Sequence, residues 1–283
     1  MLACRLIKSR ETAMMGNGEA DRHALAVARE AAMTAGRAVT AQWARFRASL
    51  RYKGHDDVVT AADMISDEII SAHIGQAFAG HRILSEESAG CDGFDFSGPL
   101  WVVDPIDGSA NYARGHRYFG IAVAFAIDGV VRAACVHAPA LGETFTAVKG
   151  RGAFLNGVAI SPAAPTDLAR AVVSTGFPHD KSDMEPLLRR VAILLGTCQD
   201  VRRSAAPVLD IAYVAAGRLD AHTETLFAWD VAAAGLIATE AGIVRSHLGQ
   251  PSRLLPPDLD GGAVLFAAPS IHRPLSAVLR ETL

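Results

Sequence analysis

Apolar residues in the first part of the chain recur at helical spacing and then give way to short apolar runs. Leu25, Ala28, Ala32, Val39 and Trp43 fall three, four and seven residues apart, as on one face of a helix. This spacing predicts a helix from Ala20 to Trp43. A second helix is expected to open at Thr60, with Ile65, Ile69 and Ala72 along its apolar face. Both helices should cover a sheet.

Short strand patterns dominate between residues 82 and 160. The dipeptides Asp128-Gly129 and Asn156-Gly157 each separate two apolar runs, and both favour tight hairpins because positive φ angles are easily reached there. The runs are 120–127 with 130–137, and 153–155 with 158–160. They predict an antiparallel sheet.

After about Ser161 the pattern changes to strands and helices in alternation. We expect strands at 172–174, 201–203 and 219–222, and helices at 184–195, 205–216 and 231–241, with Gly242 as a helix C-cap. The fold class is therefore α+β. The predicted division is a flexible extension at 1–18, an α+β subdomain at 19–162 and an α/β subdomain at 163–283.

The segment WVVDPIDGSANY, residues 101–112, carries an apolar strand into two carboxylates and a glycine turn. Pro105 should end the ladder pairing, while Gly108, Ser109 and Asn111 suit the start of a helix. Asp104 and Asp107 would then face one small site. Such carboxylates suit divalent cations that clamp a phosphate, although an ordinary Asp helix cap is the simpler alternative.

Three further acidic segments accompany this motif in a fixed order. VVTAADMISDEII and ILSEES precede it, and WDVAAAGLIATEAG follows far downstream. With these segments the chain resembles the inositol monophosphatase family of magnesium-dependent, lithium-sensitive phosphatases, from about Ala20 to near the C-terminus. The resemblance implies a layered αβαβα sandwich. It also implies that a metal-activated water hydrolyses a small-molecule phosphate monoester, with two or three Mg²⁺ ions as cofactors.

The resemblance also assigns roles to individual residues. The metal ligands would be Glu86, Asp104, Asp107, Asp230 and the backbone carbonyl of Ile106. Ser109 stands where the family has a threonine whose hydroxyl orients the attacking water. Asp63 matches the acid that pairs with that hydroxyl, so Asp63, Ser109 and Glu86 form the expected catalytic set.

Each acidic residue also has a simpler interpretation. Glu86 and Glu87 can be a solvated pair after a short strand, and Asp230 can be the N-cap of the helix that follows it. Asp63 can be the third-position acid of a capping box opened by Thr60. A DxDGT-type phosphatase, which forms a phosphoenzyme, is a further alternative, but its two acids stand two residues apart and those of DPIDGS stand three apart.

The substrate side departs from the inositol-hydrolysing relatives. Their GTAA- or GSAA-like turn reads Ala205, Ala206, Pro207, Val208 here, and the acid expected seven residues before Asp230 is replaced by Thr223, with Glu224 one position later. We expect substrate contacts from Asp107, Gly108, Ser109, Glu224 and Asp230. The exact ester is open; histidinol phosphate, another sugar or nucleotide phosphate, or a regulatory binding role with vestigial activity are the alternatives.

Composition narrows the remaining choices. The 283 residues are 50% hydrophobic with a formal charge of −3 and scattered basic residues, which gives no nucleic-acid footprint. The four cysteines, Cys4, Cys91, Cys135 and Cys198, show no CxxC pair. No apolar run approaches membrane-spanning length, and residues 1–18 do not suit a signal peptide. We expect a cytoplasmic homodimer without nucleic-acid or membrane partners.

Overall fold

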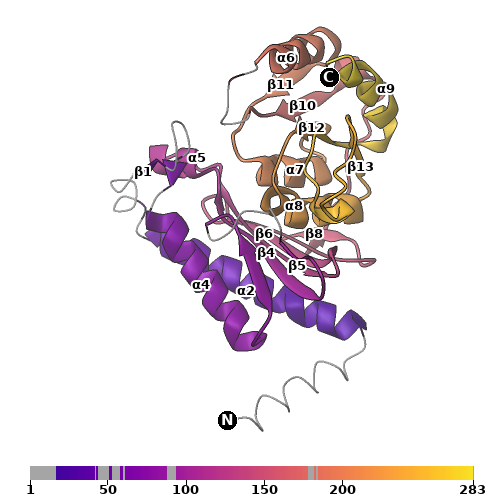
Figure 1. The fold of residues 1–283 in the computed structure, drawn as a ribbon. Helices are drawn as coiled ribbons and strands as arrows, with labels where there is room; N and C mark the ends of the chain where they lie inside the picture. The colour runs from indigo at the N-terminus through magenta and orange to yellow at the C-terminus, as the bar shows by residue number, and fades with distance from the viewer. Residues whose placement is uncertain are drawn as a thin grey trace.

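The computed structural model describes residues 17–41, 43, 51–52, 58–59, 61–87, 94–177, 182 and 184–282. Two β-sheets alternate with layers of helices in the order helix, sheet, helix, sheet, helix (Figure 1). The predicted αβαβα sandwich is therefore confirmed. Helices α2 and α4 form one outer layer, α7 and α8 the middle layer, and α6 and α9 the other outer layer.

The first outer layer packs on the larger sheet through small and branched side chains. Helix α2, Asn17–Ala41, buries five alanines and Val39, while α4, Ala61–Ala77, buries Ile70 and Ile74. The two helices contact each other, and they cover β4, β5 and β6. Both predicted helices are confirmed, although Thr60 lies outside the described residues, as do Cys4 and Cys91. Asn17 and Gly18, which were predicted to belong to a flexible extension, already belong to α2, and residues 1–16 lie outside the described residues.

The larger sheet has seven strands in the order β3-β4-β5-β6-β7-β8-β9. Asp128 and Asn156 take φ angles of 51° and 50° in their turns, which confirms both predicted hairpins. One pair departs from the expected antiparallel arrangement, because β3 runs parallel to β4. The strands are Arg82–Ser85, Pro99–Asp107, Gly120–Ile127, Val130–Ala138, Glu143–Val148, Ala153–Leu155 and Val158–Ala159.

Strand β4 runs further than the sequence indicated. Pro105 was expected to end the pairing, yet Asp107 pairs again with Gly120 after an irregularity that follows Asp104. The prolyl nitrogen has no hydrogen to donate, so the chain bulges there and then resumes its path. The bulge lets Asp104 and Asp107 face the same site from one strand.

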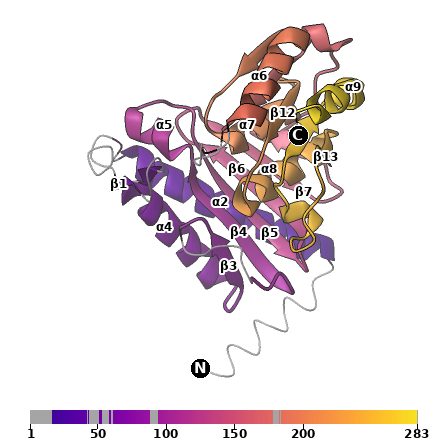
Figure 2. The same ribbon diagram turned by 45° about the horizontal axis from the view of Figure 1, so that its top comes forward.

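The smaller sheet has the order β11-β10-β12-β14-β13. Its first three strands are parallel, whereas β14 and β13 are antiparallel to their neighbours. Helices α6 and α9 lie on the outer side of this sheet (Figure 2). The elements are β10 Val172–Thr175, α6 Glu185–Thr197, β11 Asp200–Arg202, β12 Ala221–Glu224, β13 Val244–His247, β14 Val264–Ala267 and α9 Pro269–Arg280.

The middle layer joins the two sheets. Helices α7, Pro207–Ala215, and α8, Ala228–Ala241, pack against each other and against strands of both sheets. The last turn of α8 is held by Glu240, whose carboxylate accepts hydrogen bonds from Gly150, Arg151 and Gly152 at 2.7, 3.0 and 2.8 Å. Gly242 has a φ of 102° and ends the helix as predicted. The division into subdomains at residue 162 stays a prediction.

Candidate active site

The acidic segments converge where the carboxyl ends of β3 and β4 meet the amino ends of α7 and α8. Asp104, Asp107 and Asp230 each offer one carboxylate oxygen, and these oxygens lie within 4.8 Å of one another. All three residues are less than a tenth exposed. Two come from the bulged end of β4 and one from the first turn of α8, so the cluster exists only in the folded chain.

Burial and mutual repulsion raise the pKa values of the clustered carboxyls. Burial, followed by the charges of Glu86, Asp107, Asp230 and Asp63, raises the pKa of Asp104 well above its ordinary value. Burial and the charge of Asp230 do the same to the pKa of Asp107. Burial raises the pKa of Asp230 to about 7, against a hydrogen bond from Phe227. Oδ1 of Asp104 is buried without a hydrogen-bond partner. Buried carboxylates this close call for a neutralising cation.

Backbone amides fix the direction of two of these carboxylates. Val208 N–H, in the first turn of α7, donates to Asp107 Oδ2 at 2.9 Å, and Phe227 N–H donates to Asp230 Oδ2 at 2.8 Å. Asp230 was considered as a helix N-cap, but it is the third residue of α8 and reaches back to the residue before the helix. Each carboxylate keeps its other oxygen available for a cation.

Glu86 follows β3 directly, and its N–H donates to Val103 O at 3.2 Å. Because β3 and β4 are parallel, this position lies beside the carboxyl end of β4. The Glu86 charge acts on both Asp104 and Asp107. The structure therefore brings Glu86 close to the cluster, and its role as a metal ligand stays a prediction.

Ser109 connects the cluster to Asp63 on α4. Its hydroxyl lies 2.5 Å from Asp63 Oδ1 and 2.9 Å from the carbonyl oxygen of Ile106. The hydroxyl hydrogen can go to only one of these two acceptors at a time. The structure thus brings together three residues from three elements: Asp63 of α4, Ile106 of β4 and Ser109 of α5.

The loop between β4 and α5, Ser109–Arg114, closes against a second loop. Gly108 has a φ of 86°, and a Cβ there would lie 3.1 Å from Ala205 O. Asn111 braces the contact, as predicted, by donating to Tyr118 O at 2.7 Å and Ser204 O at 2.8 Å. Ala205 itself has a φ of 61°, a conformation that favours glycine. Ala205 thus introduces local backbone strain beside the site.

Glu224 ends β12 and is largely buried, which a solvated acid on a loop would not be. Its side chain is 12% exposed. Burial, followed by the Asp230 charge, raises the pKa of Glu224 to about 8, with Arg203 and Arg190 acting in the opposite direction. Glu224 therefore lies within electrostatic reach of Asp230 and of two arginines. Its contact with a substrate stays a prediction.

Sequence reasoning missed the polar residues around Glu224. Asp210, on α7, accepts a hydrogen bond from the Tyr118 hydroxyl at 2.7 Å, and burial raises the pKa of Asp210 to about 6. His222 and Arg190 are also buried. The sequence signal that could have identified His222, Arg190 and Asp210 is that each is a polar residue at an inward-facing position of β12, α6 or α7. Arg114, a basic residue soon after the DPIDGS motif that could meet an anionic substrate, is exposed at the end of α5.

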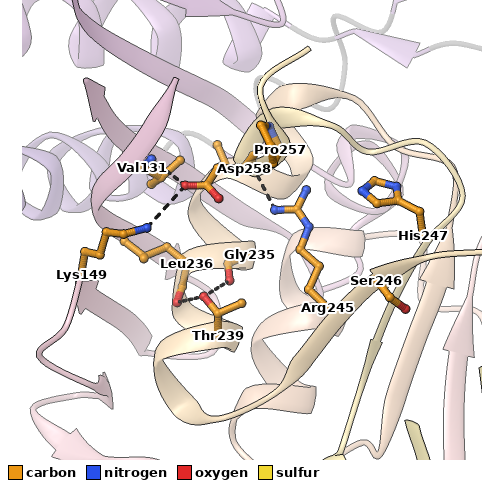
Figure 3. Close-up of a pocket in the computed structure, with 11 residues that line it drawn as sticks. Val131, Lys149, Gly235, Leu236, Thr239, Arg245, Ser246, His247, Pro257 and Asp258 are labelled. Atoms are coloured by element: carbon orange, nitrogen blue, oxygen red, sulfur yellow. Dashed lines mark hydrogen bonds and ion pairs between the residues drawn. The ribbon is translucent and has the colours of Figure 1, made fainter. Parts of the chain in front are cut away.

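A separate cavity of about 240 Å³ lies along α8, beyond the turn that carries Asp230 (Figure 3). Lys149 Nζ lies 3.8 Å from Asp258 Oδ2, and Arg245 donates to the carbonyl oxygens of Asp258 and Asp260 at 3.1 and 2.6 Å. Its charges largely compensate one another. The carboxylate cluster, in contrast, is uncompensated, and it remains the candidate for chemistry.

The donor set fits hard divalent cations. Mg²⁺ prefers oxygen ligands such as carboxylates and backbone carbonyls. Oδ1 of Asp104 is buried without a hydrogen-bond partner, so this oxygen is free to bind a cation. Cys135 and Cys198 are buried elsewhere and take no part.

The raised pKa values predict how the metal-free protein responds to pH. A carboxyl whose pKa rises on folding favours the protonated native state, so stability is highest below pH 4 for this contribution and falls as the carboxyl ionises. For Asp230 the fall should run from about pH 4 to the folded pKa of about 7. With a chelator present, we expect the Tm of the protein to fall over that pH range as the cluster ionises. Added Mg²⁺ should raise the Tm more at pH 8 than at pH 5.

Asp230→Asn provides the comparison, because it removes one charge and keeps the shape. Its metal-free Tm should fall less with pH, and Mg²⁺ should raise it less. A Tm that responds to pH and Mg²⁺ as in the parent protein would show that the cluster is not the cation site.

Comparison with known proteins agrees with this geometry. The profile of the inositol monophosphatase family matches residues 21–281. The chain belongs to the inositol monophosphatase family, as its motifs indicated.

Individual relatives differ in what they are named for. The Nus factor SuhB of Pasteurella multocida is 37% identical over 222 residues, 77% of this chain and 81% of that protein. The inositol monophosphatase of Dictyostelium discoideum is 36% identical, with 82% and 86% covered. Among solved structures, an IMPase from Thermotoga maritima matches with a TM-score of 0.80 at 29% identity, covering 93% of this chain and 98% of that one.

In the described part of the chain, the longest helices are too short or too polar to cross a bilayer. The predicted absence of nucleic-acid partners, the homodimer and the cytoplasmic location stay predictions.

Proposed function

We propose that this protein is a magnesium-dependent phosphatase that hydrolyses a small-molecule phosphate monoester by direct attack of water. The observation that carries the proposal is the cluster of Asp104, Asp107 and Asp230, whose oxygens lie within 4.8 Å of one another and whose repulsion is uncompensated. Family membership supports the same class of reaction.

Glu86, Asp104, Asp107, Asp230 and the carbonyl oxygen of Ile106 would hold the cations. Magnesium, when bound, supplies the Lewis acidity that polarises the phosphate and favours ionisation of water. Ser109 accepts a hydrogen bond from the attacking water while Asp63 takes the hydroxyl hydrogen, and this pair thereby orients the nucleophile. The N–H groups of Gly108 and Ser109, at the start of α5, would donate to the oxygens of a bound phosphate.

Phosphate release from the purified protein tests this function. Hydrolysis should require Mg²⁺ and stop in excess chelator, and it should return when Mg²⁺ is restored. A folded protein that binds Mg²⁺ but releases no phosphate from any ester would favour the second candidate, a binding role with vestigial activity. The name of the SuhB relative, a Nus factor, supports that candidate, whereas the complete carboxylate set argues against loss of chemistry.

Substrate preference can be predicted from the altered turn. We expect a panel of inositol phosphates, histidinol phosphate, fructose 1,6-bisphosphate, 3′-phosphoadenosine 5′-phosphate and glycerol phosphates to rank at least one ester above inositol 1-phosphate in kcat/KM. The strained Ala205, with Pro207 two residues further on, stands where the inositol-hydrolysing relatives have a glycine-containing turn, and by the same resemblance the stretch from Asp220 to Asp230 is one residue shorter. Hydrogen bonds to a substrate hydroxyl discriminate strongly when they are displaced. A clear preference for inositol 1-phosphate would contradict this prediction.

A further inference from the structure

One turn of helix α4 is bonded to both strands that lead into the acidic site. Ser66 and Asp67 follow Asp63 by three and four residues, so the three side chains share one face of α4, the helix that packs beside β4 (Figure 1). Asp63 contacts Ser109, just after β4. Ser66 is bonded to β4 and Asp67 to β3, and neither residue has a part in the proposed chemistry.

Ser66 supplies a hydrogen bond that the bulge of β4 lacks within its own ladder. In the pairing of β4 with β5, Pro105 and Ile106 together stand opposite Ile121. Pro105 is buried, and its carbonyl oxygen lies 2.7 Å from Ser66 Oγ. A carbonyl oxygen only accepts, so the hydroxyl donates; Ser66 itself is fully buried. Because a buried carbonyl without a donor is unfavourable, this bond favours one conformation of the bulge.

The bonded carbonyl lies in the middle of the segment that presents the two carboxylates of β4. Pro105 directly follows Asp104 and is separated from Asp107 by Ile106 alone. The carbonyl of Pro105 shares a planar peptide unit with the nitrogen of Ile106, so a fixed oxygen fixes that unit as well. The Ser66 hydroxyl therefore restricts how the chain turns between Asp104 and Asp107.

A second bond from the same turn of α4 holds the end of β3. Asp67 Oδ1 accepts from the Ser85 hydroxyl at 2.5 Å, a length typical of a hydroxyl that donates to a charged carboxylate. Ser85 is fully buried, is the last residue of β3 and immediately precedes Glu86. One short stretch of helix thus holds the backbone beside Glu86 and the backbone between the two acids of β4.

We propose that Ser66 and Asp67 are positioning residues that pre-organise the cation site, because they hold the β4 bulge and the end of β3 in place before any cation binds. This proposal rests on the proposed function. The clustered carboxylate oxygens lie within 4.8 Å of one another, so like charges favour their separation. Without the two bonds the acids would move apart in the metal-free protein. Cation binding would then have to bring them back, at a cost in affinity.

The test is the apparent Kd for Mg²⁺, measured by calorimetric titration of the metal-free protein and independently by the rise in Tm with added Mg²⁺. Ser66→Ala should weaken Mg²⁺ binding about tenfold, as expected for a group that supports a metal ligand. At saturating Mg²⁺ its kcat should return to within a few fold of the parent value, because the bound cation restores the arrangement. The KM of the preferred ester should not change. Ser66→Thr keeps the hydroxyl and should recover most of the affinity.

Ser85→Ala tests the second bond and leaves Ser66 in place. It should also weaken Mg²⁺ binding about tenfold, and it decides the outcome if Ser66→Ala does not fold. The matched control is Thr282→Val. Thr282 is fully buried just after α9, and its hydroxyl donates to Leu279 O at 2.7 Å, the same length as the Ser66 bond. This variant should lower the metal-free Tm, as Ser66→Ala does, without changing the Kd for Mg²⁺.

Distinct results overturn the two proposals. An unchanged Kd for Mg²⁺ in folded Ser66→Ala would refute the role of Ser66, and an unchanged Kd in folded Ser85→Ala would refute that of Asp67. An equal loss of affinity in Thr282→Val would assign the effect to general loss of stability and would refute both roles. Each of these results leaves the phosphatase function intact. Absence of hydrolysis of every phosphate monoester by the unmodified protein would refute the proposed function, while the Mg²⁺ affinities would still decide the positioning roles.

Discussion

Asp107→Asn and Asp230→Asn should each lower kcat by more than about a hundredfold while the protein stays folded. Changes to groups that merely support a metal ligand reduce metal affinity or activity 10–100-fold, and loss of a charged ligand should exceed that. The amide side chain keeps the shape, and it can still accept from Val208 N–H or Phe227 N–H. Steady-state phosphate release with titrated Mg²⁺ measures the effect.

The fold of these variants can be checked independently. Removal of one charge from a repelling cluster should leave the metal-free Tm at pH 8 equal to or above that of the parent protein. Asp167→Asn is the control, because Asp167 is an exposed acid whose Oδ2 lies 3.8 Å from Arg170 Nε. Full activity of either folded cluster variant would rule out the metal-ligand assignment.

Ser109→Ala should reduce kcat about a hundredfold with little change in Tm, within the range of general acid–base contributions. The alanine cannot connect Asp63 to the attacking water, although Asp63 and the Ile106 carbonyl remain. Ser109→Thr should retain activity within a few fold, because the family usually has threonine at this position. The measurement is kcat and KM at saturating Mg²⁺.

Ser276→Ala, which alters an exposed hydroxyl near Arg280 on α9, is the control for Ser109→Ala. Unreduced turnover in Ser109→Ala would mean that another group orients the water. Loss of Mg²⁺ affinity in place of turnover would assign Ser109 to the metal shell.

Local chemistry made most elements predictable from the sequence. The helix α2, the Asp128-Gly129 and Asn156-Gly157 hairpins and the C-cap at Gly242 depend on neighbouring residues, and each is present. Strand β4 extended past Pro105 because its final pairing is with β5, a contact that the local sequence does not contain.

The acidic residues of the site could be predicted from the sequence, whereas the surroundings of Glu224 could not. The motif order identified the acids that converge, since their types and spacing match one chemistry. The surroundings of Glu224 depend on long-range contacts of Gly176, His222 and Asp210, which belong to three separate elements. Burial of a loop acid is a tertiary property, and its sequence signature resembles that of a solvated one.

Helix α8 is anchored at both ends. Its third residue presents a carboxylate to the cluster, and its last turn is clasped by three amides of the turn between β7 and β8. Glu240 follows Asp230 by ten positions, so the two residues lie about 15 Å apart along the helix axis at 1.5 Å per residue. The C-terminal end of the helix is thus fixed to the larger sheet, which also carries Asp104 and Asp107. Carboxylates that lie far apart in the sequence are thereby held in place by the same sheet.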